Sequence, residues 1–356
     1  MATLRLRDRD AIITKEGLIF RVLGYSHLPD AYICDVEYAP SEIFKSNNPK
    51  AFRSLGQRVF YKFYEDEGLK FVEKSYPRYF IFHDMLRKNI IGVNQSDIIK
   101  VNKPDEKLGE IMKMESRDEL VAALHNVLEF TTQCSNLSTQ NFGVFGSLLH
   151  DFYHPKFSDL DLIIYSRENA VMLRETLQEL YGDKHSPLKN EFESNEPIKG
   201  KLWRFRNYSP KEYMWHQNRK LIYALFNDEK SGRIIKTEFE PVKDWKGINK
   251  EYDPEARVSQ KGWVKIFARI TEDHDALFIP SIYSVEPQKV LRGPKGGNDV
   301  ERIISYVEEF RMQACKDEEV YVEGNLEEVT TSKGDFCQIT LTYCPKYYEQ
   351  VLKVVF

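Results

Sequence analysis

The chain has 356 residues, enough for roughly two or three domains that each bury a core. Its formal net charge is -4, with 42% hydrophobic and 30% charged residues, which excludes a globally basic surface and indicates a globular protein. The first ten residues mix both charge signs and no apolar run approaches about 18 residues, so we expect no signal peptide, no membrane span and a cytoplasmic location. Five scattered cysteines without a Cys-x-x-Cys pair favour reduced thiols over a zinc site: Cys34, Cys134, Cys315, Cys337 and Cys344.

Residues 1–112 are expected to form a separate α+β domain. Asp8, Arg9 and Asp10 form a charge cluster that we interpret as a solvated edge before the first strand. We assign no chemistry to this domain. Its predicted elements are strands at residues 11–14, 18–24, 31–38 and 79–82 and a helix at 65–73.

A helix, two strands and a second helix are predicted next along the chain. Ser116 and Glu119 have the spacing of a capping box, with Ser116 as the N-cap of the first helix. Ser166 is the expected N-cap of the second helix. Residues 182–200 are polar and rich in proline, asparagine and lysine, which predicts an exposed loop.

The stretch 141–165 between these helices combines a strand, a glycine turn and an apolar strand. Gly146 permits close backbone approach, and the N–H groups that follow it can receive a phosphate. Asp159 and Asp161 lie two residues apart, so their carboxylates project from one face, about 6–7 Å apart. Such a pair can share hard divalent cations such as Mg²⁺. These features predict a site for a metal-bound triphosphate; the alternative is a surface turn before a strand with solvated aspartates.

Gly146-Ser147, eleven intervening residues and Asp159-x-Asp161 before an apolar strand resemble the nucleotidyltransferase superfamily typified by DNA polymerase β. The resemblance implies a small mixed sheet with flanking helices, two bound Mg²⁺ ions (Mn²⁺ as a substitute) and transfer of a nucleotidyl group from an NTP such as ATP. The whole chain also resembles a group of archaeal proteins described as predicted nucleotidyltransferases. The expected fold class is therefore α+β, with a nucleotidyltransferase domain at 113–245 between the 1–112 domain and a β-rich domain at 246–356.

The resembled family takes a third metal-binding carboxylate from a later strand that lies next to the acid pair in the sheet. A predicted hairpin with strands at 220–226 and 233–242 offers Glu238 for this role, with Glu240 as the reserve. The implied catalytic and metal-binding set is Asp159, Asp161 and Glu238, and the implied nucleotide-binding set is Gly146, Ser147, Lys156, Arg204, Arg219 and Lys220.

Family members often carry arginine or lysine directly after Gly-Ser, whereas Leu148, Leu149 and His150 follow here. For this reason the triphosphate contacts are assigned to Lys156 or to the basic stretch 201–220. His150 and His154 are interpreted as exposed loop residues without a role.

The basic stretch 201–220 carries cationic and aromatic side chains in alternation. Arg204 and Arg206 alternate with Trp203 and Phe205, which predicts a strand with one cationic face and aromatic rings available for base stacking. A solvated strand face is an equally good interpretation. A short helix is expected to start at Ser209 and end near Arg219.

Short alternating runs after residue 263 predict an antiparallel sheet or small barrel. Such barrels often bind single-stranded nucleic acid, which is an analogy of fold only. We predict a nucleotidyltransferase that acts on a hydroxyl of a nucleic acid, protein or small molecule and releases pyrophosphate. The alternative is a non-catalytic module that binds nucleic acid or protein. A metal-dependent hydrolase ranks last because the sequence lacks a His-Asp metal pattern.

Overall fold

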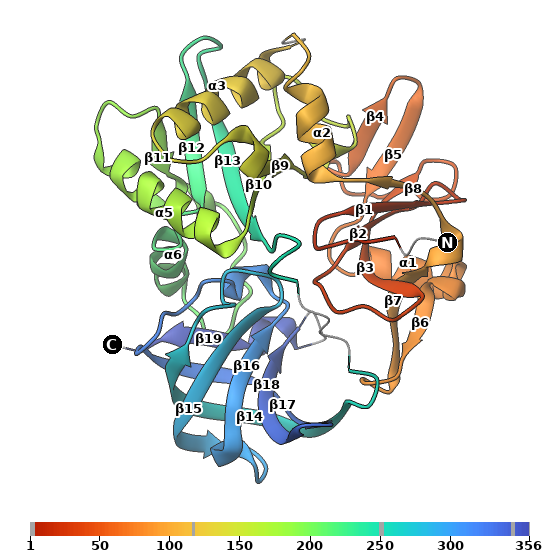
Figure 1. Cartoon of the computed structure of the whole chain (residues 1–356), viewed down its shortest axis with the longest axis vertical. Helices are drawn as coiled ribbons and strands as arrows, with labels where there is room; N and C mark the ends of the chain where they lie inside the picture. The colour runs from red at the N-terminus through yellow and green to blue at the C-terminus, as the bar shows by residue number, and fades with distance from the viewer. Residues whose placement is uncertain (1–3, 116–117, 249–252, 343–345, 356) are drawn as a thin grey trace. The chain divides into compact units, whose positions relative to one another are not determined.

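A computed structural model describes residues 4–115, 118–248, 253–342 and 346–355. These residues form a mixed α+β protein with three sheets and a strand-rich C-terminal region (Figure 1). The three-domain division expected from the sequence stays a prediction. Internal contacts divide the chain into unit 1, made of Met1–His83, Lys88–Leu188 and Ala224–Tyr252, and unit 2, made of Asp84–Arg87, Lys189–Tyr223 and Asp253–Phe356.

The first sheet of unit 1 follows the order β4-β5-β3-β2-β1-β8, and the β6–β7 hairpin joins it through β3. The strands and helix predicted in this region are confirmed within a few residues. The strands β4, β5, β7 and β8 were not predicted, because their mostly exposed or half-buried side chains lack a simple alternation. The elements are β1 (Ala11–Thr14), β2 (Ile19–Val22), β3 (Ala31–Pro40), β4 (Phe52–Leu55), β5 (Arg58–Lys62), α1 (Glu67–Ser75), β6 (Phe80–His83), β7 (Lys88–Asn94) and β8 (Ile98–Asn102).

The charge cluster before β1 is buried, so its interpretation as a solvated edge was wrong. Arg7, Asp8, Arg9 and Asp10 are each at most 3% exposed. Arg7 pairs with Asp105 at 2.7 Å, and its guanidinium stacks on aromatic rings of unit 1. The Asp8 carboxylate accepts a hydrogen bond from the Gly24 N–H. Burial is possible because the charges find partners within the same unit.

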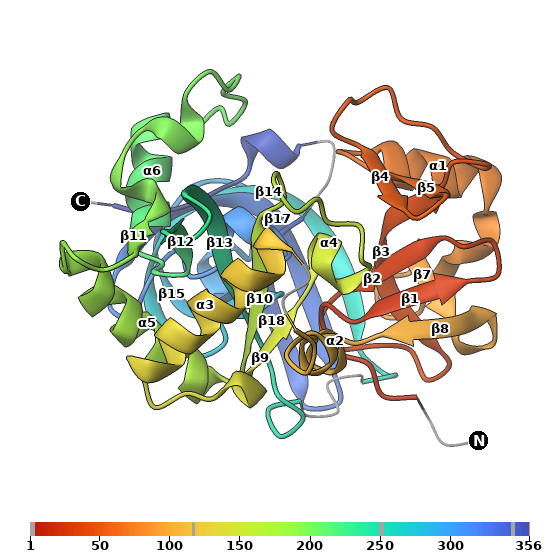
Figure 2. The ribbon, with the colours of Figure 1, turned by 90° about the horizontal axis from the view of Figure 1, so that it is seen from above.

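The second sheet is mixed and follows the order β11-β12-β13-β10-β9. The β10–β13 pair is parallel and the β10–β9 pair is antiparallel. Two long helices, α3 and α5, lie on the same face of this sheet (Figures 1 and 2). The elements are α2 (Pro104–Ile111), α3 (Glu119–Gln133), β9 (Phe142–Val144), α4 (Gly146–Leu149), β10 (Leu160–Tyr165), α5 (Arg167–Gly182), β11 (Leu188–Asn190), β12 (Tyr223–Asp228) and β13 (Arg233–Val242).

Side-chain caps fix the starts of both helices. The Asp118 carboxylate accepts hydrogen bonds from two backbone N–H groups in the first turn of α3. The predicted cap, Ser116, lies outside the described residues. The Ser166 hydroxyl accepts a hydrogen bond from the Asn169 N–H at the start of α5, as predicted. No helix in the described ranges has the length and apolarity needed to cross a bilayer.

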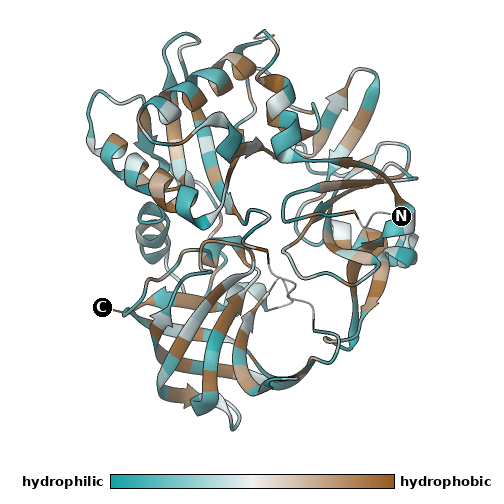
Figure 3. Cartoon of the chain, in the orientation of Figure 1, coloured by the Kyte–Doolittle hydropathy of each residue, from teal (hydrophilic) through white to brown (hydrophobic). Residues whose placement is uncertain are grey.

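Unit 2 contains a six-stranded sheet in which successive pairings close a circuit. The pairings run β14-β15-β16-β18-β17 and return from β17 to β14, while β19 adds to β17. Hydrophobic and hydrophilic residues alternate along these strands (Figure 3), and the inward set includes Ile266, Ala268 and Ile270. The elements are α6 (Pro210–Asn218), β14 (Arg257–Glu272), β15 (Ser281–Arg292), β16 (Val300–Ser305), β17 (Glu319–Thr331), β18 (Gly334–Leu341) and β19 (Val351–Val354).

Two expectations for residues 182–208 are wrong in part. The predicted exposed loop contains β11, and Leu188 and Phe192 are buried in it. The stretch that carries Arg204 and Arg206 forms no strand. Its alternation nevertheless directs both guanidinium groups outward, while Trp203 and Phe205 pack against the core of unit 2. These two rings therefore support the core instead of forming an open stacking platform.

Candidate active site

The turn after β9 is shaped by Gly146, the first residue of α4. Its backbone has a φ of +60°, a conformation that side chains disfavour. A Cβ atom at this position would lie 2.3 Å from Asp161 Oδ2, so the carboxylate packs directly against the glycine backbone. The Phe145 N–H donates a hydrogen bond of 3.0 Å to the Asp161 carbonyl oxygen. Both contacts hold the turn against the start of β10.

The parallel pairing of β10 and β13 brings a second carboxylate beside Asp161. Asp161 is opposite Glu238, and Leu160 is opposite Thr237. Paired residues on adjacent strands project from the same face, and the strands lie about 4.8 Å apart. The expectation that the strand of Glu238 neighbours the strand of the acid pair is thus confirmed. Both carboxylates keep partial solvent exposure.

From here on, the acid pair means Asp161 and Glu238. Two negative charges at this pair are unfavourable unless a cation or a proton offsets one of them. Loss of solvation and the negative charge of Glu238 raise the pKa of Asp161 to about 8. Loss of solvation also raises the pKa of Asp159, while Lys236 and Arg233 lower it. The Lys236 ammonium lies 2.9 Å from Glu238 Oε1 and offsets part of the charge.

The chemistry of the acid pair fits a hard divalent cation, because carboxylate oxygens are the ligands that Mg²⁺ prefers. Asp159, which immediately precedes β10, is more exposed than Asp161. Throughout the described ranges, no three histidine, cysteine, aspartate or glutamate side chains converge closely enough to hold a metal ion. Asp161 and Glu238 are two carboxylates on neighbouring strands, and among the described residues Asp159 does not join them in a group of three that could hold a metal ion.

Glu240, the reserve ligand, is held elsewhere. Its carboxylate lies 2.5 Å from the Arg9 guanidinium, and both side chains are at most 5% exposed. The pair connects β13 to the N-terminal charge cluster. Glu240 thus has a buried partner of opposite charge, whereas Glu238 faces another carboxylate.

The residues predicted to hold phosphate have varied surroundings. Ser147 is half-buried in α4, and its carbonyl oxygen accepts a hydrogen bond from the Phe152 N–H. Lys156 is exposed on the loop that leads to Asp159. Both residues belong to unit 1, as the acid pair does.

The three other predicted phosphate contacts belong to unit 2 and have partners there. Arg204 is exposed and donates a hydrogen bond of 3.2 Å to the Tyr348 hydroxyl. Arg219 pairs with Glu318 at 2.6 Å. Lys220 is fully buried, its pKa is lowered by burial, and its ammonium donates to the Glu309 carbonyl oxygen. The structure thus gives Lys220 a place in the core and no open surface for phosphate.

His150 was expected on an exposed loop, but the structure buries it. It is 5% exposed, its Nδ1 is 3.3 Å from the Asn102 side-chain nitrogen, and its ring packs edge-on against Tyr38. Burial lowers the pKa of His150 to about 4. His154 is exposed, as expected. The neutral His150 ring thus helps to join the Gly-Ser turn to the N-terminal sheet.

Sequence reasoning missed one cation near the acid pair, Lys62 of β5. Its positive charge lowers the pKa of Asp161, which places the two groups within electrostatic range. No pattern in the sequence connects Lys62 to the acids, because the two segments meet only through the packing of two sheets.

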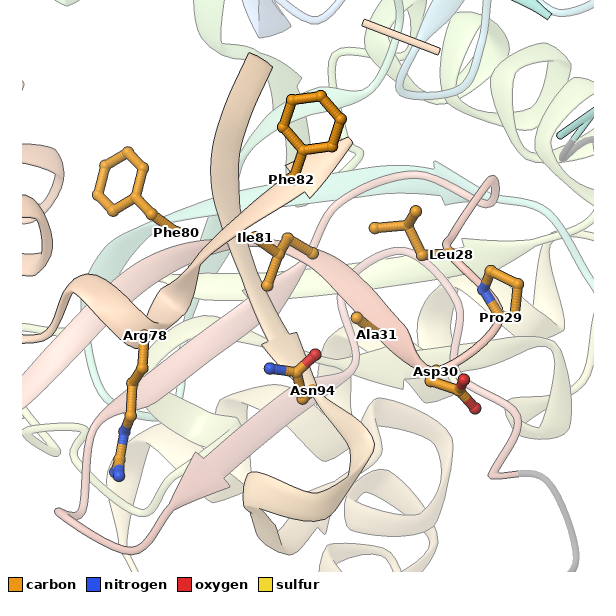
Figure 4. Close-up of a pocket in the computed structure, with 9 residues that line it drawn as sticks. All are labelled: Leu28, Pro29, Asp30, Ala31, Arg78, Phe80, Ile81, Phe82 and Asn94. Atoms are coloured by element: carbon orange, nitrogen blue, oxygen red, sulfur yellow. The ribbon is translucent and has the colours of Figure 1, made fainter. Parts of the chain in front are cut away.

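The acid pair lines neither of two surface depressions of unit 1. The depression in Figure 4 has a volume of about 440 Å³, and its lining residues come from β6, β7 and the loop before β3. Phe80, Ile81 and Phe82 are among the residues that line it. The other depression, of about 570 Å³, lies beside α2 and includes Lys107 and Asp151, which form an ion pair.

Comparison with known proteins finds a distant relative. The chain is 25% identical over 341 residues to "Uncharacterized protein MJ1086" of Methanocaldococcus jannaschii. The aligned region covers 93% of this chain and 94% of that protein. No protein-family model matches the chain, and no solved structure matches it. The similarity therefore extends along nearly the whole length of both proteins but carries no activity.

Proposed function

We propose that this protein is a metal-dependent nucleotidyltransferase of the DNA polymerase β type, which transfers a nucleotidyl group from an NTP to a hydroxyl acceptor. The observation that carries the proposal is the acid pair of Asp161 and Glu238, which are in register on parallel strands, with Asp161 packed against Gly146 of the preceding turn. Two carboxylates are brought together beside a glycine turn whose backbone N–H groups would contact a phosphate in this proposal.

In this proposal Asp161 and Glu238 would hold the divalent cation, and Asp159 would join them when metal and nucleotide bind. The cation would neutralise phosphate charge and lower the pKa of the attacking hydroxyl. The backbone after Gly146 and the Ser147 hydroxyl would position the triphosphate. The acceptor oxygen would bond to the α-phosphorus, and the bond between the α-phosphorus and the oxygen that bridges it to the β-phosphorus would break. Pyrophosphate would leave, and the hydroxyl proton would pass to solvent.

A second candidate is a binding module that retains the sheet without turnover. The ion pair of Lys236 with Glu238 favours it, since a lysine at the acid pair supplies positive charge without metal. The absence of a convergent three-residue metal group among the described residues points the same way. The two candidates differ in whether binding of an NTP requires a divalent cation.

Calorimetry with ATP, GTP, CTP and UTP, each with and without Mg²⁺, tests the proposal. The variants are Asp161→Asn and Glu238→Gln, and the matched control is Glu229→Gln, an exposed residue between β12 and β13. We expect Mg²⁺-dependent binding in the wild type and the control, and a loss of at least about tenfold in both site variants, because charge-assisted contacts are the strong ones.

Turnover is measured in parallel as pyrophosphate release in the presence of candidate hydroxyl acceptors. Binding that is independent of Mg²⁺, or that survives in Asp161→Asn, would replace the proposal with the binding-module candidate. Absence of NTP binding to the wild type would overturn both nucleotide-based interpretations of the acid pair.

A further inference from the structure

The first sheet of unit 1 packs directly against the turn that carries Gly146. An apolar seam joins them: Tyr38 of β3 and Phe60 of β5 pack with Leu149 and Phe152, which end and follow α4. The Phe60 and Phe152 ring centroids are 4.7 Å apart, and those of Tyr38 and Phe152 are 5.3 Å apart. This seam fixes one face of β3 and β5 relative to the Gly-Ser turn.

Lys62 lies on that same face. It is opposite Tyr38 in the antiparallel pairing of β3 with β5, and it is two residues after Phe60, so all three side chains project to one side. The Lys62 ammonium is 6.0 Å from the centre of the Tyr38 ring. Lys62 therefore lies at the edge of the packed seam, where its side chain is half-buried and keeps contact with solvent.

Two acids lie within electrostatic range of Lys62. Its positive charge lowers the pKa values of both Asp161 and Glu37. Within the described ranges its ammonium has no hydrogen bond and no short ion pair with either acid, although it lies within electrostatic range of both. An ammonium of this kind, beside carboxylates but not held by them, is available to an anionic ligand.

The other cations near the turn and the acid pair are paired or lie on a loop, and the nearest to Glu238, Lys236, is held by it at 2.9 Å. Leu148 and Leu149 occupy the positions directly after Gly146-Ser147 and are buried in the core. Lys156 is exposed on a loop. Arg9, the nearest buried guanidinium in the charge cluster, is paired with Glu240.

We propose that Lys62, supplied by the N-terminal sheet, contacts the triphosphate of the nucleotide bound at the acid pair. This inference rests on the proposed function and adds a role for residues 1–112, to which no chemistry was assigned from the sequence. Tyr38 and Phe60 act as positioning residues, because they hold the face of β5 against the Gly-Ser turn.

The test is calorimetry with the NTP that the wild type binds best, in the presence of Mg²⁺. The variants are Lys62→Met and Lys62→Arg, and the matched control is Lys74→Met, an exposed lysine at the end of α1. We expect Lys62→Met to weaken NTP binding by about tenfold or more, since a charged hydrogen bond is removed. Lys62→Arg should recover most of the affinity, and Lys74→Met should bind like the wild type.

The corresponding nucleoside monophosphate separates a phosphate contact from a general disturbance. If Lys62 contacts the triphosphate, Lys62→Met loses more affinity for the NTP than for the monophosphate. Equal losses for both ligands, or unchanged NTP affinity in a Lys62→Met variant whose thermal unfolding matches the wild type, would overturn this inference alone. Retained NTP binding in Asp161→Asn would instead overturn the proposed function. If Lys62→Met unfolds, Lys62→Gln provides the same comparison.

Discussion

Two glutamates of β13 have different charged neighbours: Glu238 belongs to the acid pair, and Glu240 contacts the N-terminal charge cluster. Glu240 of this strand forms a buried ion pair with Arg9. Two residues earlier, Glu238 is in register with Asp161, which has the same sign of charge, and its partner of opposite charge is the half-buried Lys236. Both members of the acid pair keep solvent contact, whereas the Arg9–Glu240 pair is almost completely enclosed.

This difference separates a structural use of charge from a functional one. A buried pair of opposite charges needs nothing further, although its net contribution to stability is small. A pair of like charges in partial contact with solvent favours a bound cation or a proton. This contrast supports the proposal that Glu238 is a ligand, whereas Glu240 belongs to a structural ion pair, although the two are neighbours on one face of one strand.

The largest expected effect comes from breaking the structural pair. Arg9→Met leaves the Glu240 carboxylate buried without its cation, which should destabilise unit 1 by about 3–5 kcal/mol. The measurement is the free energy of unfolding in urea. Arg58→Met, at an exposed arginine of β5, serves as the control and should change stability little. The double variant Arg9→Met/Glu240→Met should regain most of the loss; failure to regain it would show that the ion pair is not the source.

A smaller effect is expected at the turn of the candidate site. Gly146→Ala should cost about 1–3 kcal/mol from backbone strain at positive φ, with a further cost from the clash with Asp161. In an Asp161→Ala background the clash disappears and only the strain remains. A double-mutant cycle measured by thermal unfolding should therefore give a nonzero coupling. Additive effects would contradict the close contact between the glycine and the carboxylate.

The smallest effect concerns the pH dependence of the acid pair. Because the folded-state pKa of Asp161 is raised to about 8, its contribution to stability is fully present below its unfolded pKa and declines as pH rises toward 8. Asp161→Asn should remove this decline and stabilise the metal-free protein by about 1 kcal/mol at pH 9, since solvent screens the half-buried group. Unfolding of both proteins from pH 5 to pH 9 measures it. Parallel pH profiles would show that Asp161 is not the group responsible.

Much of the fold was predictable because local patterns determine it. The strands at β1, β3, β10 and β13, and the caps at Ser166 and Ser209, follow from side-chain periodicity and turn chemistry. The acid strand and its neighbour were also expected to pair. These features depend on residues that are close in sequence or on a family pattern.

The remaining features depend on contacts between distant segments. Burial of Arg9 requires Glu240, and the role proposed for Lys62 requires the seam between Phe60 and Phe152. A charged residue in an isolated segment is most simply read as solvated, so the sequence alone indicated an exposed edge. Lys220 was misplaced for the same reason, because its partner is a backbone carbonyl group far along the chain.

The Arg9–Glu240 pair also has a consequence for synthesis of the chain. Arg9 leaves the ribosome long before Glu240, which is among the last residues of unit 1 to follow. Until then Arg9 has no carboxylate from β13 and is more stable in water than in a core. Burial of Arg9 against Glu240 therefore cannot be completed until β13 has been synthesised.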